Sequence, residues 1–176
     1  MDDPSLFPQE YPATDEEAFL STGRHVFDIG VLKEWYQEKR PVPKVGELSF
    51  FQEPYIDSGV KYRQKVKLTE LKNGIMKIWK EPDSHKIYRI GVDVSEGIEN
   101  EFRDTDWNVA SVKDGQTKDQ VAELRCKVDP DILADYLNAL GRYYNFALIG
   151  VERNNHGLTT LAVLERVHHY PYLYRQ

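Results

Sequence analysis

Two acidic residues each close an apolar run of the sequence. Asp93 ends KIYRIGVD (86–93), and Glu152 ends FALIGVE (146–152). Apolar runs of this length predict strands buried in a sheet, and an acid that closes one needs a positive partner. Two carboxylates brought together repel unless one is protonated or a cation lies between them. Since Mg²⁺ and Mn²⁺ prefer oxygen ligands, the candidate chemistry is metal-assisted phosphodiester hydrolysis.

The elements around these acids predict an α/β fold with a mixed sheet. Tight turns join the first three strands, which must therefore be antiparallel neighbours. A strand reached through a helix then runs parallel to its neighbour, so Asp93 and Glu152 should share one sheet edge. The expected order is strands at 86–93, 107–113 and 120–127, a helix from Pro130, a strand at 146–152, a helix at 158–167, and a strand at 171–174.

The N-terminal third has a different character. Residues 1–58 are rich in proline and predict a linker or appendage, with short helices at Asp15–Leu20 and Ile29–Gln37. Residues 59–84 predict a β-hairpin that turns at Asn73-Gly74 and joins the domain at 85–176. One face of its first strand is basic, formed by Lys61, Arg63, Lys65 and Lys67. Such a face suits either a DNA backbone or an edge strand protected against aggregation.

Composition bounds the class of protein. The 176 residues are 40% hydrophobic and 30% charged, typical of a globular domain. They contain no run long enough to span a membrane and no signal peptide, and the single Cys126 excludes a disulfide framework. We therefore expect a cytoplasmic protein. The net charge is -6, but six acids lie in residues 1–20, which leaves 23 acidic against 23 basic residues elsewhere. Bulk charge neither demands nor excludes DNA.

Three segments together resemble the nuclease domain of the large terminase subunit of tailed bacteriophages. They are GVDVSEG (91–97), Asp106-Trp107 and VERNNHG (151–157). Upstream, QEYPATDEEAFLSTGRHVFD (9–28) is similar to the segment that follows the packaging ATPase in those proteins. The resemblance runs from about residue 8 to the end of the chain.

This resemblance implies an RNase H-like fold and an endonuclease that cuts concatemeric viral DNA by two-metal catalysis with Mg²⁺ or Mn²⁺. The first two family acids match Asp93 and Glu152, and Asp106 best matches an auxiliary metal ligand, with Asp104 as the alternative. Double-stranded DNA is the implied substrate. A portal protein and a small terminase subunit are implied partners, and the host bacterial cytoplasm is the implied location.

The sequence departs from the family in two places. It has no Walker A loop, so residues 1–58 are expected to follow an ATPase domain that this chain lacks. The third family acid lies beyond the fifth strand, where the sequence ends at Gln176. We therefore expect a nuclease domain truncated at its C-terminus, as in a fragment or a split or degenerate gene product.

Some residues allow two readings. Arg153 could contact the scissile phosphate or pair with a carboxylate, and Asn155 or His156 could cap a helix or touch a phosphate at its N-terminus. Trp107 is predicted to be a core or interface aromatic, as are Tyr170, Tyr172 and Tyr174. Two other functions stay open: a non-catalytic assembly module that docks to the packaging motor, and an actin-like nucleotide-binding protein.

Overall fold

The computed structural model describes residues 31, 34–35, 41–95 and 106–175. The chain divides into two compact units, Met1–Pro41 and Val42–Gln176, and the second contains the sheet. The expected helix at Asp15–Leu20 lies outside the described residues. The helix expected at Ile29–Gln37 is described only at Val31, Glu34 and Trp35, which are helical. No helix in the described part of the chain is long and apolar enough to cross a membrane.

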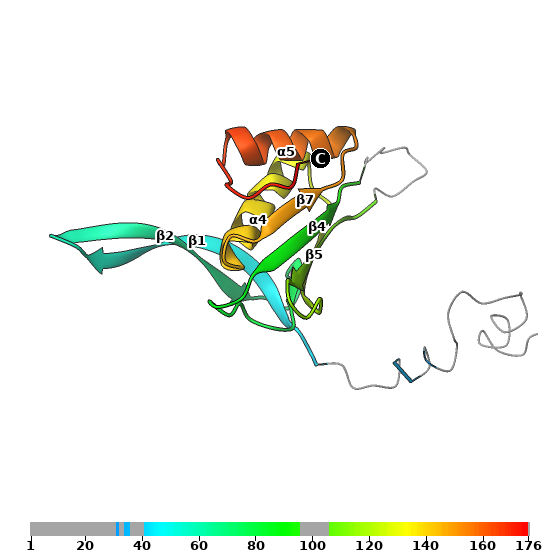
Figure 1. Cartoon of the computed structure of the whole chain (residues 1–176), viewed down its shortest axis with the longest axis horizontal. Helices are drawn as coiled ribbons and strands as arrows, with labels where there is room; N and C mark the ends of the chain where they lie inside the picture. Colours follow the sequence, from blue (N-terminus) through cyan, green and yellow to red (C-terminus); the bar gives the residue numbers. More distant parts are fainter. Residues whose placement is uncertain (1–30, 32–33, 36–40, 96–105, 176) are drawn as a thin grey trace, which may run out of the picture. The chain divides into compact units, whose positions relative to one another are not determined.

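Seven strands form one mixed sheet in the order β2-β1-β3-β6-β5-β4-β7 (Figure 1). Strand β4 pairs antiparallel with β5 and parallel with β7, and β5 pairs antiparallel with β6. This is the predicted RNase H-like arrangement of three antiparallel strands followed by helix, parallel strand and helix. The elements are β1 Lys44–Ile56, β2 Val60–Glu70, β3 Met76–Ile78, β4 Tyr88–Asp93, β5 Asn108–Asp114, β6 Gln120–Cys126, α4 Pro130–Tyr143, β7 Leu148–Val151 and α5 Asn155–Arg166.

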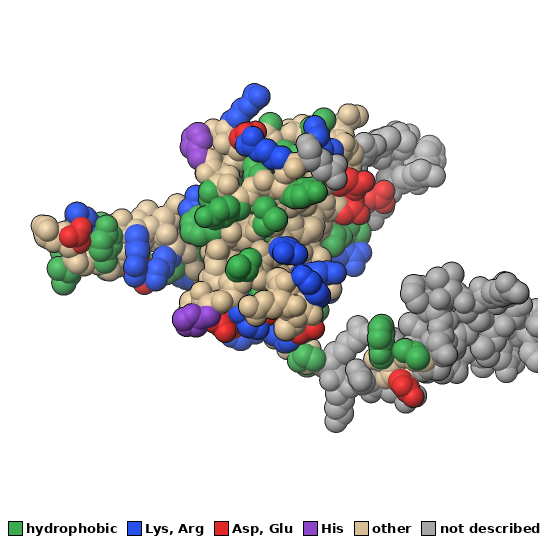
Figure 2. Space-filling model, in the orientation of Figure 1, with side chains coloured by type: hydrophobic (Ala, Val, Ile, Leu, Met, Phe, Trp, Pro, Cys, Tyr) green, Lys and Arg blue, Asp and Glu red, His purple; other side chains and the backbone are tan. Residues whose placement is uncertain are grey.

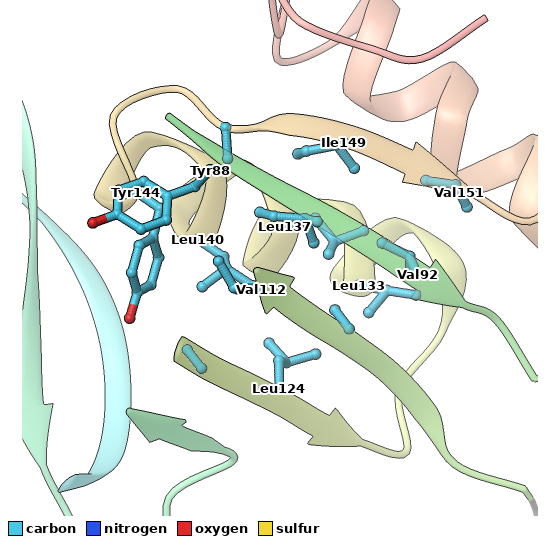
Figure 3. Close-up of a cluster of buried hydrophobic side chains, with 14 of the residues drawn as sticks. Tyr88, Val92, Val112, Leu124, Leu133, Leu137, Leu140, Tyr144, Ile149 and Val151 are labelled. Carbon is cyan, nitrogen blue, oxygen red and sulfur yellow. The ribbon is translucent and has the colours of Figure 1, made fainter. Parts of the chain in front are cut away.

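The core lies on one face of this sheet. Alternate residues of β4, β5 and β6 point toward α4, whose Leu133, Leu137 and Leu140 are fully buried beneath them (Figure 3). Burying each such side chain stabilises the fold by about 1.5–3 kcal/mol. Pro130 occupies the first turn of α4, where its missing N–H costs nothing. Figure 1 shows α4 behind β4 and β7, so the opposite face of the sheet is turned toward the reader.

That opposite face, called the open face here, corrects one expectation. The apolar runs that end at Asp93 and Glu152 were expected to form strands buried in the sheet. Instead β4 alternates strictly between buried and exposed residues, and Leu148 on β7 is 36% exposed. The two sequences look continuously apolar because Gly91 and Gly150 occupy positions that point outward from the core. In an alternating strand a polar side chain would usually stand at such a position.

The hairpin pairing expected across Asn73-Gly74 is wrong. Strand β2 pairs with β1 over eleven residue pairs, and β1 rather than β2 pairs with β3. The hairpin turn lies instead at 57–59, where Ser58 and Gly59 both have positive φ. Gly74 is needed for a different reason, because a Cβ there would overlap the backbone of Gly46 as the chain passes β1. Strand β1 falls within the segment predicted as a linker.

The expected strand at 171–174 is reduced to a single parallel bridge between Leu173 and Ile149 of β7. Two backbone hydrogen bonds hold it: Ile149 donates to Tyr172 O at 2.9 Å, and Tyr174 donates to Ile149 O at 2.8 Å. Tyr170 is a core residue, as expected, and its hydroxyl donates to Ala147 O at 2.6 Å. Tyr172 and Tyr174 are more than half exposed, so neither is a core residue, and an interface role stays a prediction.

Candidate functional site

Asp93 and Glu152 meet at one edge of the open face. The parallel register pairs Val92 with Val151, and the next backbone step has Glu152 N donating to Val92 O at 3.0 Å. The two acids are therefore opposite one another on neighbouring strands, roughly 4.8 Å apart along the hydrogen-bonding direction. Both are exposed, and their strand neighbours Val92 and Val151 point into the core. In Figure 2, acidic side chains gather where Figure 1 shows β4 and β7 ending.

The start of α5 fixes the backbone around these acids. Asn154 caps the helix by accepting a hydrogen bond from Gly157 N at 2.7 Å. Its amide nitrogen also donates to Val94 O at 2.6 Å, directly after Asp93. One side chain thus links the ends of β4 and β7. The helix begins at Asn155, three residues before its predicted start at 158.

Asn108, which sequence reasoning did not single out, makes a second link. It is 2% exposed, and its side-chain oxygen accepts from Ser95 N at 2.9 Å. Its amide nitrogen donates to Val128 O at 2.9 Å, just before α4. His156 Nδ1 lies 3.0 Å from Ser95 O and holds the same turn from the other side. The signal available in the sequence was an asparagine at the start of β5, directly before the apolar Val109 and Ala110.

Asp106, the proposed third ligand, is exposed and precedes β5, whose Val109 pairs with Asp93. It therefore lies along the same edge of the sheet. Among the described residues no three His, Cys, Asp or Glu side chains are grouped so as to hold a metal ion. The structure brings together the pair Asp93 and Glu152, while Asp104 lies outside the described residues.

Two of the predicted DNA contacts stand beside the acid pair. Arg153 follows Glu152, is exposed, and makes no ion pair with a described residue. It lines a groove along α5 together with Arg166 and Arg175. Asn155, at the first turn of α5, is exposed and its side chain is free to meet an anion at the helix N-terminus. His156 is half-buried and engaged with Ser95, which leaves it a positioning role.

The basic face of β2 exists as predicted, but its cations are already partnered. Lys61 pairs with Asp57 at 2.7 Å, and Glu53 of β1 pairs with both Arg63 and Lys65. Lys67 lies 5.9 Å from the ring centre of Phe51. Strand β2 also forms one of the two edges of the sheet. Edge protection and DNA contact both remain compatible with this arrangement.

Trp107, which the sequence predicted to be a core or interface aromatic, does not lie in the core. Its side chain is 44% exposed, and two cations lie over its ring: Arg125 at 4.4 Å and Lys127 at 4.8 Å from the ring centre. Trp107 precedes β5, and its neighbour Asn108 takes the buried position at the start of that strand. The edge that carries the acids therefore also carries an exposed aromatic with cations.

No protein-family model matches the chain, and comparison with curated proteins gave no match. Similar solved structures include the large terminase nuclease from thermophilic phage G20c with bound cobalt. It is 19% identical over 60% of this chain and 53% of that chain, with a TM-score of 0.49. The same nuclease with bound magnesium is 21% identical over 58% and 50% of the two chains, with a TM-score of 0.47.

The nuclease domain of the Thermus phage P74-26 large terminase is also similar, with 18% identity over 60% of this chain and 50% of that chain and a TM-score of 0.45. The chain spans about half the length of each of these solved structures.

Proposed function

We propose that this chain is the metal-binding portion of a DNA endonuclease of the large terminase type. The observation that carries this proposal is the meeting of Asp93 and Glu152 on the open face at the ends of two neighbouring parallel strands. Nothing in the described residues neutralises the pair, since neither acid makes an ion pair there. Residues 91–97 and 151–157 resemble motifs of the large terminase nuclease domain, and this resemblance suggests phosphodiester hydrolysis as the reaction.

The donor set fits Mg²⁺ or Mn²⁺. These ions take oxygen ligands, and Mg²⁺ is commonly held by one or two carboxylates while water and phosphate oxygens complete its shell. Asp93 and Glu152 would supply those carboxylates, and Asp106 would act as an auxiliary ligand. A bound divalent ion of this kind lowers the pKa of water and stabilises the leaving oxygen of a phosphodiester. The exposure of both acids leaves room for a phosphate to approach.

Double-stranded DNA is the proposed substrate, in the form of concatemeric genomes cut during packaging. Arg153 and Asn155 would hold the phosphate beside Glu152, from the side of α5. The basic face of β2 would provide a second, more distant contact through Lys61, Arg63, Lys65 and Lys67. A portal protein, a small terminase subunit and the host cytoplasm belong to the same proposal. We also propose that the chain divides into a linker at 1–58, a joining segment at 59–84 and a nuclease domain at 85–176.

Plasmid nicking in the presence of Mn²⁺ tests the catalytic assignment. The chain should nick supercoiled DNA, and Asp93→Asn and Glu152→Gln should each abolish nicking with little change in volume. Glu70→Gln, which removes one exposed charge from the end of β2, is the matched control and should leave nicking unchanged. Equal cleavage by all variants would defeat the assignment.

One observation favours a second candidate, the non-catalytic assembly module. The described residues group only two acids, whereas two-metal sites usually carry more. Titration of Mn²⁺ by calorimetry separates the candidates. Binding that depends on Asp93 and Glu152, without nicking by the chain, would favour a docking role that keeps the metal site.

A further inference from the structure

Arg125 lies in the same row of the open face as Asp93. The antiparallel registers pair Asp93 with Val109 of β5, and Val109 with Arg125 of β6. Arg125 points away from the core, because its neighbours Leu124 and Cys126 on the same strand are buried. Two strand spacings separate Arg125 from Asp93, about 10 Å. This separation allows the two residues to meet different phosphates of one DNA backbone, whose charges follow one another about every 3.4 Å of helix axis on each strand.

Trp107 supports the guanidinium of Arg125 at this position. The Arg125 Cζ atom lies 4.4 Å from the centre of the indole ring. A guanidinium that rests on an aromatic ring keeps its planar fork of N–H donors, which suits phosphate oxygens. Arg125 makes no ion pair with any residue that the structure describes. Glu123, the acid nearest to it on β6, pairs instead with Lys77 at 3.6 Å.

Cations therefore flank the acid pair on both sides. Arg153 lies beyond Glu152 at the β7 side, and Arg125 with Lys127 lies on the β6 side. In Figure 2, basic side chains are visible on the same face as the acidic group. An anionic polymer that crosses the carboxylates would meet positive charge both before and after them. A compact anion would not need this spacing.

We propose that Trp107 and Arg125 bind the DNA backbone about 10 Å from the phosphate that is cut, two strand spacings away on the side opposite to Arg153. Arg125 contacts a phosphate, and the exposed indole of Trp107 packs against the adjoining sugar. This inference rests on the proposed function and deepens it by naming a second contact for the same substrate. Exposed Trp and Arg side chains are also common in protein–protein interfaces. DNA is favoured over a protein partner because Arg125 lies in the same row of the sheet as Asp93.

Duplex binding in EDTA tests the contact without cleavage. The probe is a fluorescein-labelled DNA duplex, followed by anisotropy at several salt concentrations. Arg125→Gln should weaken binding roughly tenfold and lower the slope of log affinity against log salt by about 0.9, the loss of one phosphate contact. Trp107→Leu should weaken binding about tenfold, whereas Trp107→Phe, which keeps an aromatic ring, should restore most of it.

The chain offers a matched control. Arg142 lies over the Phe146 ring at 5.1 Å, and Phe146 is 41% exposed. This pair precedes β7, whereas Glu152 follows it, so the pair lies at the opposite edge of the sheet. Arg142→Gln removes the same charge and should change duplex affinity by less than twofold.

The outcomes separate the two proposals. A chain that binds the duplex while Arg125→Gln and Trp107→Leu bind equally well would overturn the contact and leave the nuclease assignment standing. Equal weakening of duplex binding by Arg142→Gln would also overturn the contact, because the loss of affinity would then follow from the overall charge of the protein. Failure of the unaltered chain to bind duplex at low salt would count against the proposed function itself.

Discussion

The first turn of α5 passes directly over the carbonyl oxygen of Glu152, at Gly157. A Cβ built on Gly157 would overlap that oxygen and would also crowd the Asn154 side chain. The glycine is therefore required for close approach rather than for an unusual φ. Because Glu152 is one of the proposed metal ligands, the geometry of the site depends on Gly157, a residue that carries no functional group.

Gly157→Ala should therefore harm both stability and the site. The helix start must move away from Glu152, and overpacking of this kind costs about 1–3 kcal/mol of unfolding free energy. Affinity for Mn²⁺ should fall as well, since the Glu152 carboxylate shifts with its backbone. Urea denaturation and Mn²⁺ titration measure the two effects. Gly91→Ala is the control, because a Cβ there meets nothing within 4 Å and should cost no stability. Equal stability of the two variants would contradict this account.

Replacing one proposed ligand should stabilise the metal-free protein. Asp93 and Glu152 face one another without a described cation between them, and two charges about 5 Å apart in water repel by about 1 kcal/mol. Asp93→Asn removes that repulsion, so its melting temperature in EDTA should equal or exceed that of the unaltered chain.

Excess Mn²⁺ reverses this order. A ligand at a hundredfold its dissociation constant stabilises the folded state by about 2.7 kcal/mol. The unaltered chain should gain that stability, and Asp93→Asn should gain little. Thermal melts with and without Mn²⁺ measure the difference. An equal metal-induced shift in both proteins would place the ion elsewhere.

The sequence was sufficient to predict the strands that carry the acids. Apolar runs ending at Asp93 and Glu152 became β4 and β7, and the helix between them dictated their parallel pairing. The polar links could not be predicted, because Asn108 and Asn154 act through backbone groups far away in the chain. Local sequence patterns predict secondary structure through their periodicity. They do not predict which distant backbone carbonyl a side chain will bind.

The hairpin shows where local signals fail. Asn73-Gly74 is a strong two-residue turn signal, yet β2 and β3 do not pair. Strand β1 takes the place between them, and eleven residue pairs with β2 outweigh the preference of one turn. For Trp107 the sequence left core and interface roles open, and the structure shows an exposed ring with Arg125 and Lys127 beside it.

Asp114 should make stability depend on pH in the acid range. Its side chain is 2% exposed, and a hydrogen bond from Lys86 at 2.7 Å, helped by the backbone N–H groups of Gln116 and Thr117, lowers its pKa to about 2. An unfolded aspartate has a pKa of about 3.9. The lower folded value means that the contribution is complete above about pH 4 and is lost as pH falls toward about 2.

Asp114→Asn should therefore be less stable than the unaltered chain at pH 6, and the gap should narrow as the pH falls below 4. Urea denaturation across this range measures it. Asp119→Asn provides a control in the same turn, because its ion pair with Lys80 is exposed and contributes little. A gap that stays constant down to pH 2 would contradict the role assigned to the Asp114 carboxylate.

Glu53 decides how much positive charge the basic face of β2 offers. Hydrogen bonds from Lys65 and Arg63 hold the pKa of Glu53 below its ordinary value, so it stays ionised and neutralises part of that face. If the face contacts DNA, Glu53→Gln should release both cations and tighten duplex binding severalfold at low salt, with a steeper salt dependence. Anisotropy with a labelled duplex measures this. Glu70→Gln on β2 removes the same charge away from that cluster, so similar gains from both variants would indicate bulk charge. No gain from Glu53→Gln would leave edge protection as the role of the four cations.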